Sequence, residues 1–160
     1  MPDDAAKRTV VDAFEQGAHL GALDGRFVKL VELAMKMVGL ELARNVKPGE
    51  RPGFCVPAHV DTGAKVNSGA VLLLEERVVI AWSEGTIRPK PRSLAVALSD
   101  IGDVRAFKRK VGRVSAQLDA ISFSAHGRKI EIVLHSVVSH ERVALMISGR
   151  LDGSVAFSNE

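Results

Sequence analysis

The order of local patterns along the chain predicts an α+β fold: two helices, then an antiparallel sheet of about seven strands, then a last helix. Residues 3–45 carry apolar side chains at helical spacing. From Gly69 onward the pattern changes to short β-type runs separated by turn residues. Helical spacing returns over residues 139–150. The length of 160 residues fits one domain, or a small domain with an appendage.

The first predicted helix begins at an aspartate and ends at a glycine. Asp3 or Asp4 can cap it, because a carboxylate accepts hydrogen bonds from the free N–H groups of a first turn. Gly17, Gly21 and Gly25 then recur every four residues, and each costs about 1 kcal/mol relative to alanine inside a helix. We therefore expect the helix to end near Gly17 and a turn to follow.

A second helix is predicted over residues 25–44, with Asp24 as its cap. Its apolar residues cover more than one face, and its charged residues do not form a clean opposite face. Such a helix must bury most of its surface, against its own domain or against a second chain. The sequence therefore predicts a protein partner or self-association, through Phe27, Val31, Met35 and Val38.

Two Pro-Gly pairs in NVKPGERPGF, residues 45–54, predict a break after the helices. On this basis the chain divides into a helical hairpin over residues 1–46, a linker or loop over residues 47–68, and a β domain with its C-terminal helix over residues 69–152.

The β domain is predicted to be a series of antiparallel strands joined by short turns. Glu75-Glu76 predicts one tight hairpin, residues 99–102 predict a turn, and His126-Gly127 predicts the last hairpin. Ser139 can cap the final helix. The expected strands are residues 70–76, 77–82, 92–98, 103–107, 113–118, 120–125 and 129–134.

Composition favours a cytoplasmic location. The single cysteine, Cys55, excludes an internal disulfide and suits a reducing compartment. The acidic start of the chain lacks the apolar core of a signal peptide. The most hydrophobic stretch, residues 27–43, carries four charged side chains, so we expect a helix of a soluble protein and not a membrane span.

Positive charge is concentrated in one segment. Residues 86–115 hold eight basic and two acidic residues, a net charge of +6, whereas the rest of the chain has a net charge of −3. If the two loops of this segment meet in the fold, six charges converge, and each is worth about 1 kcal/mol beside an anionic bilayer. The alternative is two solvated loops. The predicted binding residues are Arg88, Lys90, Arg92, Arg105, Lys108, Arg109, Lys110 and Arg113.

Nucleic acid is a rival target for the same segment, but the aromatic content argues against it. The chain has no tyrosine, one tryptophan and six phenylalanines. Proteins that bind single strands usually need exposed aromatic rings on which bases stack.

No motif predicts an enzyme, a metal site or a cofactor, and the chain has no glycine-rich phosphate loop. His59 and Asp61, in AHVDTG, have a spacing that resembles the first zinc ligands of dinuclear-zinc peptidases. Glu75 or Glu76 would have to supply the general base from inside a hairpin, so we interpret the segment as a loop or strand edge. Cys55 and His59 would not meet in an extended segment, and we expect a buried cysteine.

Four segments of the β region together resemble the pleckstrin-homology-like (PH-like) fold, including its GRAM-like and bacterial members. The resemblance covers residues 69–151 and implies an open barrel of about seven strands in two orthogonal sheets, plugged by a C-terminal helix. It also implies a scaffold that binds lipids or protein segments and seldom catalyses. The segments are GAVLLLEERVVIAW, ALSDIGDVRAF, ISFSAHGRKIEIVL and SHERVALMISGRL.

One departure from that family concerns the first hairpin loop. Members that bind phosphoinositides keep basic residues in and beside this loop, whereas Glu75-Glu76-Arg77, at the first hairpin predicted here, is short and acidic. This difference argues against recognition of inositol phosphates.

The sequence thus predicts a non-catalytic binding or assembly module, which docks an acidic partner on residues 88–92 and 105–113 or self-associates through residues 27–43. The alternative is a peripheral binder of anionic membranes or nucleic acid that uses residues 86–115. The least favoured hypothesis is a small zinc hydrolase built around His59 and Asp61.

Overall fold

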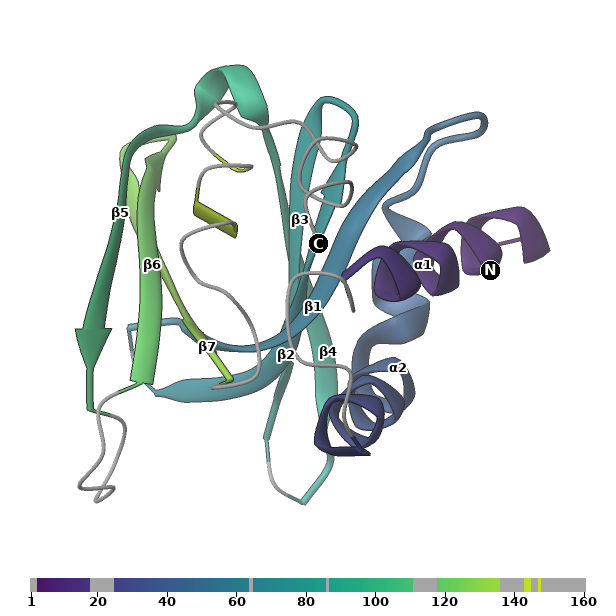
Figure 1. The fold of residues 1–160 in the computed structure, drawn as a ribbon, viewed down its shortest axis with the longest axis horizontal. Helices are drawn as coiled ribbons and strands as arrows, with labels where there is room; N and C mark the ends of the chain where they lie inside the picture. The colour runs from purple at the N-terminus through teal and green to yellow at the C-terminus, as the bar shows by residue number, and fades with distance from the viewer. Residues whose placement is uncertain are drawn as a thin grey trace.

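The chain has the predicted α+β fold, in which two helices precede a seven-stranded antiparallel open sheet (Figure 1). The structure is a computed structural model that describes residues 3–17, 25–63, 65–85, 87–110, 118–135, 143–144 and 147. Its elements are α1 (Asp4–Gly17), α2 (Gly25–Arg44), β1 (Pro52–Asp61), β2 (Val66–Leu74), β3 (Arg77–Glu84), β4 (Lys90–Ala97), the 3-10 turn η2 (Leu98–Asp100), β5 (Gly102–Arg109), β6 (Leu118–Ala125) and β7 (Arg128–Leu134).

The strands follow the order β4-β3-β2-β1-β7-β6-β5, and all neighbours are antiparallel. β1 to β4 form one meander and β5 to β7 another. The seam between them is short, because β1 pairs with β7 only from Ala58–Leu134 to Asp61–Glu131. Figure 1 shows that the sheet curls so that β5 and β6 lie opposite β3 across the interior. This arrangement is compatible with the PH-like fold.

Both helices have the predicted bounds. The N–H of Ala6 donates a hydrogen bond of 2.8 Å to Oδ1 of Asp3, so Asp3 is the cap of α1. α1 ends at Gly17, and α2 spans residues 25–44. The predicted cap of α2, Asp24, lies outside the described residues. Within the described part of the chain, no helix is long and apolar enough to cross a membrane.

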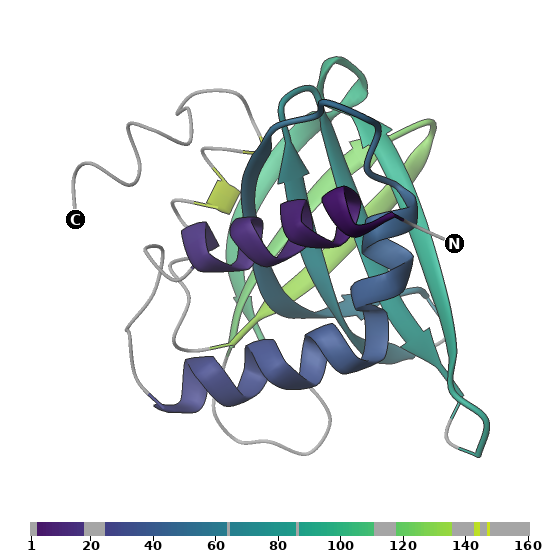
Figure 2. The same cartoon turned by 90° about the vertical axis from the view of Figure 1, so that its right-hand side faces the viewer.

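The helices cover the outer face of β1, β2 and β3 (Figure 2). Val10, Phe14, Val38 and Leu42 are buried there against the sheet, in a cluster that we call the outer cluster. Because these central strands are buried on both faces, their sequences are continuous apolar runs such as AVLLL and VVIA instead of alternating patterns.

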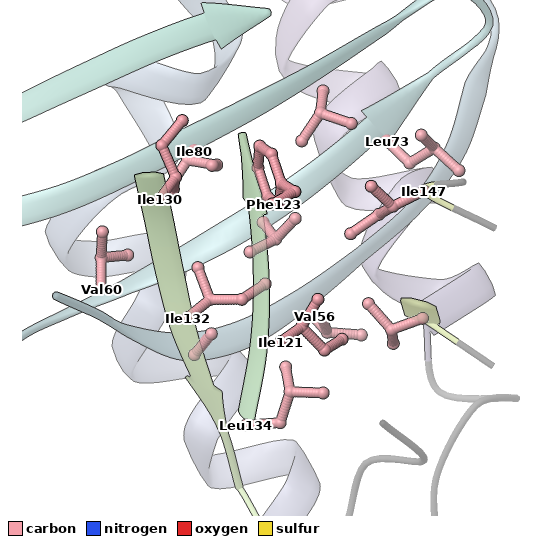
Figure 3. Close-up of a cluster of buried hydrophobic side chains, with 14 of the residues drawn as sticks. Val56, Val60, Leu73, Ile80, Ile121, Phe123, Ile130, Ile132, Leu134 and Ile147 are labelled. Atoms are coloured by element: carbon pink, nitrogen blue, oxygen red, sulfur yellow. The ribbon is translucent and has the colours of Figure 1, made fainter. Parts of the chain in front are cut away.

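A second hydrophobic cluster, the inner cluster, fills the space enclosed by the curled sheet (Figure 3). It takes alternate residues from each strand, because successive side chains of a strand point to opposite faces. β1 illustrates the alternation. Phe54, Val56, Ala58 and Val60 belong to the inner cluster, and Cys55 belongs to the outer one.

The prediction that residues 47–68 form a linker is wrong, because most of the segment is strand. Residues 52–61 are β1, and β2 begins at residue 66. Local patterns did not predict this strand because it contains Pro52, Gly53 and Pro57, and proline and glycine are normally depleted in sheets. Pro57 is tolerated one residue before β7 begins to pair with β1, so it removes no hydrogen bond from that seam.

Two predicted hairpins are confirmed, and one assignment changes. The turn Glu75-Glu76 joins β2 to β3, and His126-Gly127 joins β6 to β7 with φ angles of 53° and 74°, as a type I′ turn requires. The first hairpin is therefore β1–β2, whose last pair is Asp61 and Val66, and not the hairpin at Glu75-Glu76.

Two predicted elements fall largely outside the described residues. Of the expected strand 113–118, only Leu118 is described, and it begins β6. Of the expected C-terminal helix, Val143, Ala144 and Ile147 are described, and Val143 and Ile147 are buried in the inner cluster. The helix as an element stays a prediction.

Candidate functional site

The predicted basic residues divide between the two outermost strands of the sheet. Arg88, Lys90 and Arg92 lie on the β3–β4 loop and the start of β4, whereas Arg105, Lys108 and Arg109 lie on β5. Lys110 follows β5 and is exposed. Arg113 lies outside the described residues. That the two groups converge on one partner stays a prediction.

Four of these cations are already paired with carboxylates of the same chain, which reduces the positive charge that they offer to a partner. For Arg88, Lys90 and Lys110, by contrast, no ion pair is present within the described ranges. The pairs are Arg92 with Glu84 at 3.5 Å, Arg105 with Asp103 at 3.2 Å, Lys108 with Asp119 at 3.0 Å, and Arg109 with both Asp61 and Glu131.

Arg109 connects three strands. Its guanidinium, at the end of β5, donates to Oδ2 of Asp61 at 2.9 Å and to Glu131. Asp61 and Glu131 face each other across the β1–β7 seam, where two like charges would repel. The guanidinium, about one quarter exposed, neutralises part of that repulsion. We therefore regard Arg109 as a structural residue of the seam.

The geometry excludes Glu75 and Glu76 as the general base of a zinc site at His59 and Asp61. Asp61 and Val66 are paired at one end of the β1–β2 hairpin, and Pro52 and Leu74 are paired at the other end. Glu75 and Glu76 follow that far end, roughly 25–30 Å from Asp61 at the rise of a β-strand. Neither glutamate can serve as a base for chemistry at Asp61. Among the described residues, no group of three or more His, Cys, Asp or Glu side chains could hold a metal ion.

Cys55 is fully buried, as predicted. Burial raises the pKa of its thiol well above the ordinary value, which disfavours the thiolate that a nucleophile would need.

A pair of histidines that the sequence did not identify lies at the other end of the seam. The rings of His59 on β1 and His135, just after β7, have centroids 4.7 Å apart and planes tilted by 55°. Burial lowers the pKa of His59. Burial and the charge of His59 lower the pKa of His135 to about 4. Both rings are therefore neutral at pH 7.

A pocket of about 430 Å³ opens at the mouth of the curled sheet. Its apolar wall consists of Val60, Ile80, Trp82, Leu94 and Ile130, which come from both meanders. Polar residues of the β1–β2 turn and of the start of β7 form its rim. The sequence could not indicate this pocket, because its residues come from four strands whose pairing depends on the unpredicted strand β1.

A short polar network borders the pocket. Nε1 of Trp82 donates to Glu84 at 2.9 Å, and Arg92 pairs with the same carboxylate. The hydrogen bond from Trp82 and the charge of Arg92 lower the pKa of Glu84. These contacts hold the indole ring in place beside the pocket.

The residues predicted for self-association are largely used inside the chain. Val38 is 1% exposed against the sheet, and Val31 and Met35 are partly buried on the clusters. The side chain of Phe27 is outside the described set. Of the two alternatives for α2, the structure shows burial against its own domain at Val31, Met35 and Val38, and self-association stays a prediction. Val28, Leu33 and Leu40 remain about half exposed.

Comparison with known proteins adds little. No protein-family model matches the chain, and no curated protein matches it. One similar solved structure is the C-terminal domain of an unknown protein from Leishmania infantum, with 16% identity and a TM-score of 0.46 over 74% of this chain and 96% of that one. Another contains the linker-DH/PH domains of p115-RhoGEF, with 13% identity and a TM-score of 0.41 over 92% of this chain and 40% of that one. Both TM-scores lie below 0.5, so neither likeness carries an argument.

Proposed function

We propose that this protein is a non-catalytic binding module on a PH-like scaffold, and that it docks an acidic protein partner through the β3–β4 loop. The proposal rests on the exposure and the positive charge of that loop. Arg88 and Lys90 are exposed, and within the described ranges neither has a carboxylate partner. Ile87 beside them is 93% exposed. The loop projects from the body of the molecule (Figure 2).

The loop is better prepared for binding than β5. An acidic partner of Arg105, Lys108 or Arg109 has to compete with a carboxylate of the same chain. Within the described structure Arg88 has no ion pair, and Lys90 has none either, although it lies opposite Glu84, whose carboxylate pairs with Arg92. Pro89 and Pro91 restrict the backbone around them, which reduces the conformational entropy lost when the loop docks.

An anionic membrane is the second candidate, because Ile87 would enter the apolar layer while Arg88 and Lys90 contact headgroups. Two cations contribute about 2 kcal/mol, and burial of one isoleucine contributes roughly 1.5–3 kcal/mol. The sum corresponds to dissociation constants on the order of millimolar. A folded protein partner can add contacts beyond these three residues, whereas a bilayer reached by the loop alone cannot, so we favour the protein partner.

The test measures binding of a fluorescently labelled, glutamate-rich peptide that contains leucine, by anisotropy across a salt series. We expect binding that weakens with salt and that falls about fivefold to tenfold when Arg88→Ser and Lys90→Ser are combined. The matched control combines Arg105→Ser and Lys108→Ser, which removes the same charge from β5.

Equal losses in both variants would mean that net charge, not the loop, governs binding, and this would contradict the proposal. Flotation with vesicles that contain phosphatidylserine separates the two candidates. Vesicle binding without peptide binding would favour the membrane.

A further inference from the structure

We propose that the pocket at the mouth of the sheet, the mouth pocket, binds an aliphatic chain that ends in a carboxylate. The site goes beyond the docking loop and uses neither Arg88 nor Lys90. Three observations carry it: an apolar wall, a size that suits a small ligand, and a cation at the opening that has no ion pair among the described residues.

The apolar wall is the open end of the inner cluster. Val60, Ile80 and Ile130 lie together at one end of that cluster, and Leu73 and Ile147 lie at the other end (Figure 3). The other side chains of the inner cluster fill the interior of the sheet. At the end formed by Val60, Ile80 and Ile130, the neighbouring side chains of Trp82 and Leu94 are only partly buried. Apolar surface of this kind favours a hydrocarbon chain over water.

The size of the pocket suits a ligand of medium length. Its volume of about 430 Å³ lies within the range of about 300–1,000 Å³ that is usual for small-molecule sites. At about 30 Å³ for a water-sized group, it has room for about fourteen such groups. A saturated chain of about ten carbons with its carboxylate fits this space.

Charge at the rim selects an anion. Arg128 begins β7, and strand alternation puts it on the same face as Ile130, which lines the pocket. Arg128 is exposed, and the described residues give it no ion pair. The two carboxylates of the rim, Asp61 and Glu131, are held by Arg109. Among the described residues, the charge left without an ion pair at the mouth is therefore positive, and a guanidinium can bind a carboxylate through two hydrogen bonds.

The neighbouring cation provides a matched control. Lys129 has the same charge and is also exposed at the rim, but alternation assigns its side chain to the opposite face from Ile130. If Arg128 anchors the ligand, its replacement should weaken binding, whereas replacement of Lys129 should not.

The chain carries its own reporter. Trp82 is the single tryptophan, the chain has no tyrosine, and the indole lines the pocket. We would titrate the protein with decanoate, below the concentration at which it forms micelles, and follow tryptophan fluorescence. Decanol tests the chain without the charge, and acetate tests the charge without the chain. We expect saturable binding of decanoate, weaker binding of decanol and no response to acetate.

Three variants locate the ligand. Arg128→Ser should weaken decanoate binding by at least about tenfold, and Lys129→Ser should change it by less than about threefold. Leu94→Phe, which fills the pocket at a partly exposed position, should abolish binding while circular dichroism stays native. Arg88→Ser combined with Lys90→Ser should bind decanoate as the unaltered protein does, so this test is independent of the proposed docking loop.

No saturable response to decanoate from folded protein would overturn the assignment. Equal losses in the Arg128 and Lys129 variants would also overturn it, because general charge attraction would then explain the binding. Since Arg128 is exposed, its substitution leaves the core intact and keeps the test valid if Leu94→Phe does not fold.

Discussion

At the scale of single residues, whether a basic side chain is available for binding depends on ion pairs with carboxylates that are distant in sequence. The sequence was enough to locate the cluster of basic residues, because that needs only counting. It could not reveal that Arg109 is held by Asp61, a residue 48 positions away. The contact depends on β1, which local patterns did not predict. For the same reason, the sequence did not show that the rings of His59 and His135 are neighbours.

The two histidines predict a pH dependence of stability. An unfolded histidine has a pKa near 6.5, whereas the pKa of His135 in the folded protein is lowered to about 4. Between these values the unfolded chain binds more protons, so protonation favours unfolding. This contribution to stability is complete above pH 6.5 and is lost progressively as the pH falls toward 4.

We therefore expect the free energy of unfolding to fall by about 1–2 kcal/mol between pH 7.5 and pH 5, after allowance for the partial exposure of the ring. Urea unfolding at several pH values measures this slope. His135→Gln should remove most of it. If the His135 variant keeps the full slope, other groups cause it.

At the scale of elements, local rules predicted the helices better than the strands. The bounds of α1 follow from an aspartate cap and a terminal glycine, which are visible in a few adjacent residues. β1 was missed because its prolines and glycine contradict strand propensity, and only the pairing with β2 and β7 explains why they are tolerated. What a strand accepts depends on its neighbours in the sheet, and these are distant in sequence.

The contact between α1 and β1 predicts the effect of one methyl group. A Cβ on Gly17 would lie 2.0 Å from the backbone oxygen of Cys55, too close for any side chain. Gly17→Ala should therefore destabilise the protein by at least about 2 kcal/mol, although alanine favours a helix by about 1 kcal/mol. The clash lowers the free energy of unfolding and the helix preference of alanine raises it. The sign of the measured change therefore shows which effect is larger.

Gly102→Ala is the control for this substitution, because a Cβ at Gly102 meets nothing within 4 Å. We expect a change within about 0.5 kcal/mol. Urea unfolding of both variants at pH 7 measures the difference. A neutral or stabilising Gly17→Ala would show that α1 does not pack this closely on β1 in solution.

At the scale of the whole molecule, the sequence separated helices from strands but not the way they pack. The change in hydrophobic period near Gly69 was sufficient to predict an α+β fold. The same change also led us to predict a separate helical hairpin. Helix periodicity shows that a face is buried, but it does not show which part of the chain that face contacts. In the structure that face supplies Leu42, Val38 and Phe14 to a cluster shared with Leu72 and Val79 of the sheet.

This shared cluster predicts that the helices and the sheet unfold together. Far-ultraviolet circular dichroism follows the helices strongly, whereas fluorescence follows Trp82 on β3, which packs against the inner cluster. In a cooperative unit both signals change at the same urea concentration. Leu42→Ala, at a fully buried position of α2, should lower both midpoints together and reduce stability by about 2–5 kcal/mol.

Leu33→Ala on the exposed side of α2, where the side chain is 51% exposed, should cost much less and serves as the matched control. Two separate transitions, with only the circular dichroism transition moved by Leu42→Ala, would mean that the helices form an independent appendage. Coincident transitions would mean that the outer cluster couples α2 to the inner cluster through β1, β2 and β3, whose alternate side chains belong to both. Docking at the β3–β4 loop and binding in the mouth pocket would then both depend on helices that supply none of the described residues of either site.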